Sequence, residues 1–214
     1  LAVLPTIAPY LLPRFFAQLT ERYPDLDIRI LEMKTAPSLA ALQRGEIDAA
    51  IIASQPKEPQ LQAQTLFYEQ FFGYVAKGDP LFKKSLIRTA DISDEHLWLL
   101  DEGHCFRDQL LRFCQMEKVK VRQAAYRLGS METFMRMVES GNGVTFIPQL
   151  ATYQLSHEQQ ELVRPFAIPK PTREIMWVTR TDFVRHAIAQ IIVESIRQAV
   201  PKELHTLQVG QKIV

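Results

Sequence analysis

Hydrophobic and polar residues follow one another in blocks along the N-terminal part of the chain. Residues 9–23 carry apolar side chains at helical spacing, and residues 48–53 are apolar almost without interruption. The first pattern predicts an amphipathic helix, and the second predicts a strand that is buried on both faces. Strands are also expected at residues 1–4 and 27–31, and a short helix at residues 37–44. This succession is a βαβαβ unit, for which a parallel sheet flanked by helices is the simplest fold.

A second block of alternating elements follows a long extended segment. Residues 61–75 are rich in aromatic side chains and predict one long strand. Beyond it, short apolar runs again alternate with helical spacing. Strands are expected at 97–100, 121–125, 143–147 and 174–179. Helices are expected after the first of these strands, ending at about Glu117, and at 130–140 and 183–200.

The two blocks predict two α/β lobes, each a mainly parallel sheet flanked by helices. We expect the first lobe to comprise residues 1–68 and 174–200, and the second lobe residues 69–173, so that the chain crosses between them. Residues 202–214 show no clear periodicity, and we expect residues 201–214 to form a C-terminal tail. In such a fold, the cleft between the lobes is the natural place for a ligand.

Composition and charge are those of an ordinary soluble globular protein. Of the 214 residues, 47% are hydrophobic and 23% are charged, with a formal net charge of +1. DNA-binding surfaces usually need a clustered basic excess, so this chain by itself is not expected to bind nucleic acid. No apolar run could span a membrane, and residues 1–3 are too short for a secretory signal. Since the chain begins within a predicted strand, we expect a preceding segment outside this sequence.

The chain contains two cysteines, Cys105 and Cys114. Two cysteines do not make the disulfide framework of a small secreted protein, and no histidine lies at metal-ligand spacing from them. Motifs for dinucleotides, for nucleoside phosphates and for a serine nucleophile are also missing from the sequence. We therefore expect a cytoplasmic protein with two free thiols and with neither a cofactor nor a metal.

Cys105 stands in a setting that suits a reactive thiol. It follows Gly103 and His104, just beyond the apolar run 97–100, and is expected near a helix N-terminus. Helix N-termini favour a thiolate, and His104 and Arg107 add cationic or donor groups. A thiolate attacks peroxide to give a sulfenic acid, which a second thiol converts to a disulfide. The alternative is a buried cysteine acting as a small apolar residue, and the residues alone leave the two interpretations evenly balanced.

Cys114 has apolar neighbours, so the residues alone favour a buried structural role. It lies nine positions after Cys105, which would place the two residues about 13 Å apart along a helix and on roughly opposite faces. A disulfide needs the two Cα atoms within about 7 Å of each other. Either no bond forms, or the helix must unravel, and the second outcome would be a conformational switch.

Several stretches resemble the effector-binding domain of LysR-type transcriptional regulators. They are LAVLP at 1–5, LQRGEIDAAII at 42–52, LFYEQFFGYVAKGDP at 66–80 and VESGNGVTFIP at 138–148. Two further segments resemble the peroxide-sensing members of that family: LPTIAPYLLP at 4–13 and DEGHCFRDQLLRFC at 101–114.

This resemblance implies a two-lobe fold of the periplasmic-binding-protein type that forms a homodimer or tetramer. It implies that hydrogen peroxide oxidises Cys105, the peroxidatic thiol, and that Cys114 is the resolving thiol. The full-length protein would bind promoter DNA through an N-terminal winged helix-turn-helix and would contact RNA polymerase. Glutaredoxin or thioredoxin would be the reductant. Oxidation would be stoichiometric, so the protein would not be an enzyme, and no membrane is involved.

Two threonines are further candidates for the peroxide site. Thr6 and Thr35 follow the first two predicted strands, where an α/β fold presents side chains to a ligand. A hydroxyl there could hold peroxide or water, although both residues are also typical of caps and turns. Thr35 is followed by Ala36, where the best-known relatives have a histidine, so this part of the pocket departs from the family pattern.

The remaining candidates carry charge. His104, Arg107 and Asp108 match the family segment directly, as groups that bind peroxide or activate the thiolate. For Asp108 the alternative is a structural role, as a partner of Arg107 or a helix cap. Arg180 follows the strand predicted at 174–179 and could orient the site, or could be a solvated surface residue.

Three functions remain open at this point. The first is a redox-switched regulatory domain, and the second is an ordinary LysR-type domain whose cleft binds a small metabolite. The third is a thiol peroxidase, which has little support because the chain has no C-x-x-C motif.

Overall fold

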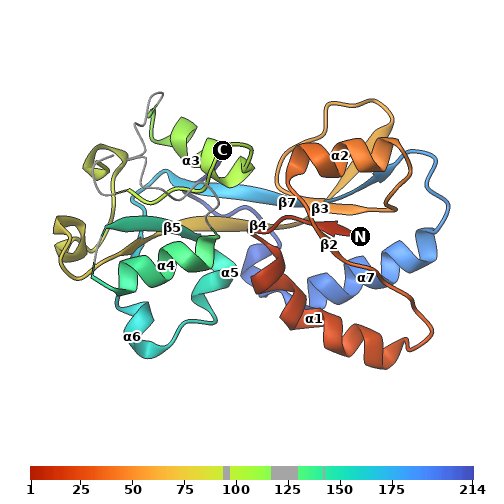
Figure 1. The fold of residues 1–214 in the computed structure, drawn as a ribbon, viewed down its shortest axis with the longest axis horizontal. Coiled ribbons are helices and arrows are strands. Elements are labelled where there is room, and N and C mark those ends of the chain that lie inside the picture. The colour runs from red at the N-terminus through yellow and green to blue at the C-terminus, as the bar shows by residue number, and fades with distance from the viewer. Residues whose placement is uncertain (94–96, 117–129, 142) are drawn as a thin grey trace. The chain divides into compact units, whose positions relative to one another are not determined.

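Two sets of strands, each with its own helices, make up the fold (Figure 1). The computed structural model describes residues 1–93, 97–116, 130–141 and 143–214. The described chain divides into two compact units. Unit 1 comprises Leu1–Tyr68 and Glu174–Gln208, and unit 2 comprises Glu69–Arg173 and Val209–Val214.

Unit 1 is built on a sheet with strand order β2, β1, β3 and β7. β1 pairs in parallel with β2 and β3, whereas β7 is antiparallel to β3. Three helices cover this sheet: α1 packs against α7, and α2 lies on the other face (Figure 1). The bounds are Ala2–Val3 for β1, Leu31–Glu32 for β2, Ala50–Ile52 for β3, Lys170–Arg180 for β7, Ala8–Arg22 for α1, Thr35–Gln43 for α2 and His186–Ala199 for α7.

The sequence accounts for these elements locally. The buried face of α1 contains Leu11, Phe15 and Leu19, which are spaced for one side of a helix. Pro9 lies in the first turn, where a missing N–H does no harm. All of β3 is buried, as its apolar run predicts. Gly45 follows α2 with φ +70°, the left-handed conformation that commonly ends a helix.

Unit 2 is built around β4, which is Leu61–Val75 and begins in unit 1. β5 and β6 pair with β4 in antiparallel fashion, and β8 pairs in parallel with the start of β7. α4 packs on β5 (Figure 1). The bounds are Val144–Pro148 for β5, Val163–Pro165 for β6, Gln211–Ile213 for β8, Cys105–Phe113 for α3, Met131–Glu139 for α4, Gln149–Thr152 for α5 and His157–Gln160 for α6. Short 3-10 helices lie at Pro80–Lys83, Thr89–Asp91 and, in unit 1, Lys202–Leu204.

The α/β class and the long strand at 61–75 are confirmed. The helix expected at 130–140 is also confirmed, with the Ser130 hydroxyl accepting a hydrogen bond from the Thr133 N–H. The sheet of unit 2 is mixed rather than mainly parallel, because β5 and β6 return against the long β4. The strand predicted at 121–125 lies outside the described residues.

Two strand predictions were wrong in extent. At 27–31 only Leu31 joins a strand, because its partner β1 is two residues long and offers no further ladder. At 97–100 the structure has a single bridge, between Leu97 and Val144. The leucines of that segment are buried, so its apolar pattern reflects packing rather than strand pairing.

Candidate redox site

The segment before α3 places Cys105 at the first position of a helix. Gly103 adopts φ 86°, which a residue without Cβ tolerates and which turns the chain into α3. His104 is the N-cap residue, and it makes no side-chain capping hydrogen bond. The predicted position of Cys105 at a helix start is therefore confirmed, and this residue lies at the positive end of the helix dipole.

His104 is held in place by an acidic neighbour. Its Nε2 lies 3.1 Å from Oδ1 of Asp101, and its side chain is 11% exposed. This contact fixes the imidazole beside the helix start that carries Cys105. Asp101 belongs to the segment that matched the peroxide-sensing regulators but was not among the predicted site residues.

Arg107 and Asp108 occupy the first turn of α3. An Arg107 guanidinium nitrogen lies 3.8 Å from Oδ1 of Asp108, which is half exposed. Arg107 Nε is buried and has no hydrogen-bond partner among the residues that the structure describes. A buried donor without a partner is rare, because leaving it unsatisfied costs about 1–3 kcal/mol. Such a donor suits a site that receives a small polar molecule.

Cys114 is the C-cap residue of α3, at the opposite end from Cys105. Both cysteines are free thiols. With the helix intact between them, the rise of about 1.5 Å per residue keeps them too far apart for a disulfide. Burial raises the pKa of Cys114 to about 12, so this thiol stays protonated near neutral pH.

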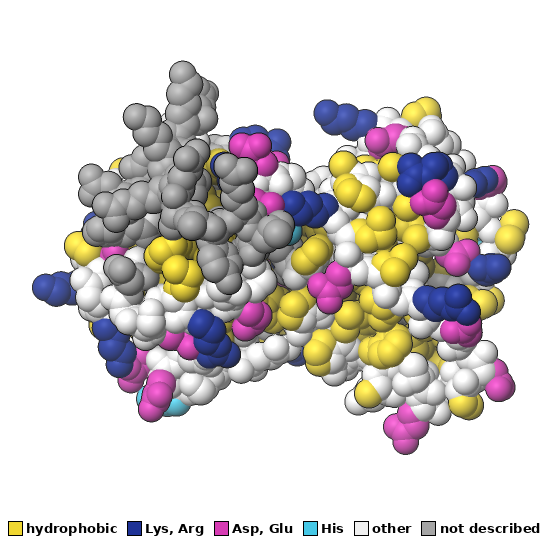
Figure 2. All heavy atoms as spheres, viewed as in Figure 1, with side chains coloured by type: hydrophobic (Ala, Val, Ile, Leu, Met, Phe, Trp, Pro, Cys, Tyr) yellow, Lys and Arg dark blue, Asp and Glu magenta, His cyan; other side chains and the backbone are white. Residues whose placement is uncertain are grey.

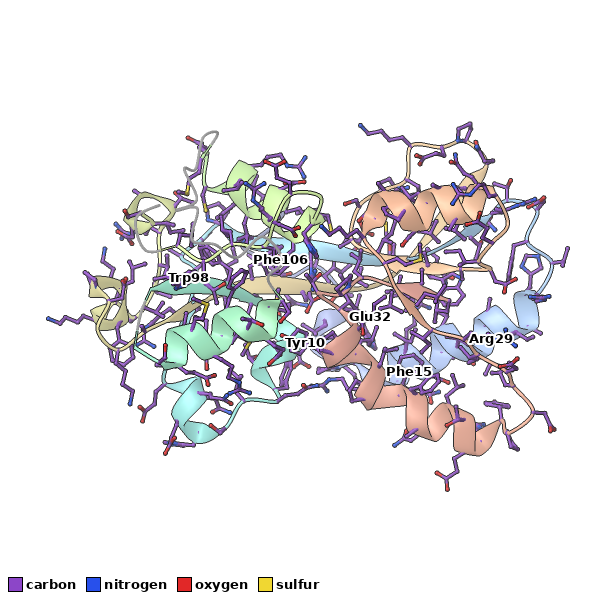
Figure 3. All side chains as sticks on the ribbon, viewed as in Figure 1. Tyr10, Phe15, Arg29, Glu32, Trp98 and Phe106 are labelled. Carbon is purple, nitrogen blue, oxygen red and sulfur yellow. The ribbon has the colours of Figure 1, made fainter. Side chains whose placement is uncertain are left out.

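The aromatic ring of Phe106 anchors the start of α3 in unit 2 (Figure 3). Its centroid lies 4.7 Å from the ring of Phe71 on β4, and the Arg173 guanidinium carbon lies 5.0 Å from it. Arg173 forms an ion pair of 2.7 Å with Glu69, and both side chains are 1% exposed. Glu69 also accepts a hydrogen bond from the Leu150 N–H.

The Arg173–Glu69 pair and Gln109 were missed at the sequence level. Gln109 lies in the middle of α3, is 3% exposed, and donates from Nε2 to the carbonyl oxygen of Val214. A usable signal was available: Glu69 interrupts an aromatic strand, and Arg173 lies within β7, two residues before its apolar run 175–178. Charged residues in strands buried on both faces need partners.

The structure places the remaining candidates in unit 1. Thr6 is buried in the turn between β1 and α1, and Thr35 is the first residue of α2. Thr35 Oγ1 is buried without a hydrogen-bond partner in the described part of the chain. Arg180 pairs with Asp182 through two guanidinium nitrogens and is 39% exposed. The five candidates of unit 2 are thus brought together on α3 and its start, whereas these three belong to the other unit.

The described residues also bear on whether the chain holds a metal site or a membrane-spanning helix. Within the described ranges, no three His, Cys, Asp or Glu side chains gather as a metal site would require, and no helix there is long and apolar enough to cross a membrane. Basic and acidic side chains intermingle on the face drawn in Figure 2, in keeping with the net charge of +1.

We expect iodoacetamide to modify Cys105 and to spare Cys114 in the reduced native chain near neutral pH. A pKa of about 12 leaves Cys114 with about three orders of magnitude less thiolate than an ordinary cysteine. Peptide mass spectrometry after short labelling measures the two sites separately. In concentrated guanidinium chloride, both cysteines should label at similar rates. Equal labelling of the two in the native chain would show that Cys114 is not protected by burial.

Comparison with known proteins identifies the family to which this chain belongs. The LysR substrate binding domain family matches residues 1–201. A crystal structure of an OxyR mutant from Porphyromonas gingivalis is 51% identical, with a TM-score of 0.94, and the match covers 100% of this chain and 98% of that one. A cysteine-to-serine mutant of Corynebacterium glutamicum OxyR with H2O2 bound is 28% identical with a TM-score of 0.79, over 92% of this chain and 63% of that one.

A curated relative extends the same picture to a longer protein. The probable hydrogen peroxide-inducible genes activator of Mycobacterium leprae is 35% identical over 96% of this chain. This chain spans 66% of that relative's length, so about a third of that protein has no counterpart here. Given the family match and the 51% identity to a solved OxyR, the chain belongs to the LysR substrate binding domain family and resembles its OxyR members.

Proposed function

We propose that this chain is the redox-sensing regulatory domain of a transcription factor that responds to hydrogen peroxide. The observation that carries this proposal is the placement of two free thiols at the two ends of one helix, α3. A disulfide between Cys105 and Cys114 cannot form while α3 persists. Oxidation therefore has to change the conformation, which is what a sensor requires and what a catalyst would avoid.

The chemistry proceeds in two steps. The Cys105 thiolate attacks one oxygen of hydrogen peroxide, the O–O bond breaks, and a sulfenic acid forms as hydroxide leaves and takes up a proton. Once α3 opens and Cys114 leaves its buried site, the Cys114 thiolate attacks the Cys105 sulfur, and the sulfenic oxygen leaves as hydroxide and takes up a proton to give water. In sum, two thiols and one peroxide molecule give one disulfide and two molecules of water. One peroxide molecule is therefore consumed for each chain that is oxidised.

Several side chains support the first step. The step takes place at the N-terminus of α3, where Cys105 directly follows His104 and shares the first helical turn with Arg107. Arg107 Nε, which has no hydrogen-bond partner among the described residues, is available to a peroxide oxygen, and Asp108 orients Arg107 through their contact. The H2O2-bound relative shows that an OxyR of this fold can hold peroxide.

Three residues of unit 1 belong to the proposal as well. We assign Thr6 and Thr35 as hydroxyl groups that bind peroxide or its attendant water. Thr35 Oγ1 suits this role because it is buried without a partner among the described residues. Arg180 orients the site in this proposal, although its guanidinium is engaged by Asp182 in the reduced chain.

The second step is what transmits the signal. Bringing Cys114 to Cys105 unwinds α3 and withdraws Phe106 and Leu110 from the core of unit 2. In the full-length protein this rearrangement alters the homo-oligomer, its promoter binding and its contact with RNA polymerase. Glutaredoxin or thioredoxin then reduces the disulfide, which places the protein in the reducing cytoplasm.

Mass spectrometry of the purified chain after substoichiometric peroxide tests this proposal. We expect a Cys105–Cys114 disulfide, and a dimedone adduct on Cys105 when dimedone is present during oxidation. If both thiols stay reduced while a metabolite raises the melting temperature, the chain is a ligand-binding domain and not a redox sensor. Rapid, sustained peroxide consumption with thioredoxin and its reductase would instead identify a thiol peroxidase.

A further inference from the structure

The last described strand lies on unit 2 at the start of β7. In β8, Gln211, Lys212 and Ile213 pair in parallel with Lys170, Pro171 and Thr172. The Lys170 N–H donates to the Gly210 carbonyl at 2.8 Å, and the Val214 N–H donates to the Thr172 carbonyl at 3.1 Å. The end of the chain is therefore held by backbone hydrogen bonds to one strand.

A side chain of α3 makes a further contact with this strand. Gln109 Nε2 donates to the Val214 carbonyl oxygen at 3.0 Å. Gln109 is almost fully buried and lies between the two cysteines, four residues after Cys105 and five before Cys114. The contact thus reports on the part of α3 that has to unwind when the disulfide forms.

β8 is a short strand that lies largely at the surface. It is three residues long, Ile213 is 46% exposed, and Val209 just before it is fully exposed. So short a strand buries little apolar surface of its own. Beside the backbone hydrogen bonds to β7, the Gln109 side chain therefore provides a direct link between β8 and α3.

We propose that residues 209–214 form a latch that holds α3 helical in the reduced chain and is released when the Cys105–Cys114 disulfide forms. This inference rests on the proposed function, since disulfide formation is what opens α3. Unwinding moves the Gln109 amide away from the Val214 carbonyl, and β8 loses its contact with α3. Coupling of this kind is reciprocal, so removal of the latch also makes α3 easier to unwind.

Hydrogen exchange of the peptide that contains residues 209–214 tests the latch. In the reduced chain, Gln109→Leu removes the donor, retains bulk and helix propensity, and should speed exchange of the β8 amides about fivefold, as expected for one hydrogen bond. Arg112→Leu is the matched control, because Arg112 is exposed on the same helix and donates to the Asp108 carbonyl within it. The control should leave β8 exchange unchanged. Equal β8 protection in the wild type and Gln109→Leu overturns the latch.

The oxidised chain provides the second measurement. After peroxide treatment of the wild type, the β8 amides should exchange as fast as in Gln109→Leu, and Gln109→Leu should form the disulfide about fivefold faster than Arg112→Leu does, by the same one-hydrogen-bond reasoning. A chain that contains the disulfide but keeps β8 protected overturns the latch alone. A chain that forms no disulfide overturns the proposed function as well, and the mass of the Cys105 peptide distinguishes the two results.

Discussion

Replacement of Cys105 by serine is expected to abolish the response of the chain to hydrogen peroxide while leaving the fold intact. Serine is close to cysteine in size, and Cys105 is only partly buried at the start of α3, so little packing is lost. A hydroxyl does not form a sulfenic acid, so the first chemical step is missing. The readouts are the mass of the peroxide-treated chain and the hydrogen exchange of α3 before and after treatment.

The matched control is Cys114→Ala, which retains the attacking thiol and removes its partner. Here peroxide should still oxidise Cys105, giving a persistent sulfenic acid that dimedone traps, and α3 should stay helical. Should Cys105→Ser still rearrange with peroxide, Cys105 is not the sensor. Should Cys114→Ala reach the same oxidised conformation as the wild type, Cys114 is not the resolving thiol.

Replacement of Glu69 by alanine should destabilise the chain by about 3–5 kcal/mol, because it leaves Arg173 as a buried charge without its partner. The Leu150 N–H would also lose the acceptor that Glu69 provides. Urea unfolding followed by circular dichroism measures the loss of stability. Fluorescence of the two tryptophans provides a second probe of the same unfolding.

Two comparisons separate the cost of leaving a buried charge unpaired from the cost of shortening a side chain. Glu69→Leu combined with Arg173→Met removes both charges and should recover most of the lost stability, because well-packed apolar residues often replace a buried ion pair without loss. Arg44→Ala breaks the exposed pair with Glu46 and should have little effect. If Glu69→Ala were as mild as Arg44→Ala, the Arg173–Glu69 pair would not be buried as described.

Local sequence patterns predicted those helices and strands whose structure depends mainly on their own residues. The strand at 61–75 is long and aromatic, and the helix after Ser130 has its own cap, so both were predicted closely. The strands at 27–31 and 97–100 were not, because strand formation needs a neighbour of matching length and the chain itself does not reveal the length of that neighbour.

The candidate site divides in the same way. Cys105 could be placed at a helix start because Gly103 and the preceding apolar run lie beside it in sequence. Glu69 and Arg173 form an ion pair although they are 104 positions apart in the sequence. Gln109 likewise contacts Val214, which lies 105 positions later. Contacts of this range exist only after the chain has folded, so periodicity and spacing carry no direct information about them.

The buried, protonated state of Cys114 has a consequence for timing. Under the proposed function, oxidised Cys105 has no partner until α3 opens, however quickly peroxide arrives. The disulfide therefore forms no faster than the helix opens, even when peroxide is abundant. A sulfenic acid on Cys105 that is reduced back to the thiol before the helix opens gives no disulfide, whereas one that lasts until the helix opens does. The helix thereby makes the chain respond to oxidation that persists and not to oxidation that is quickly reversed.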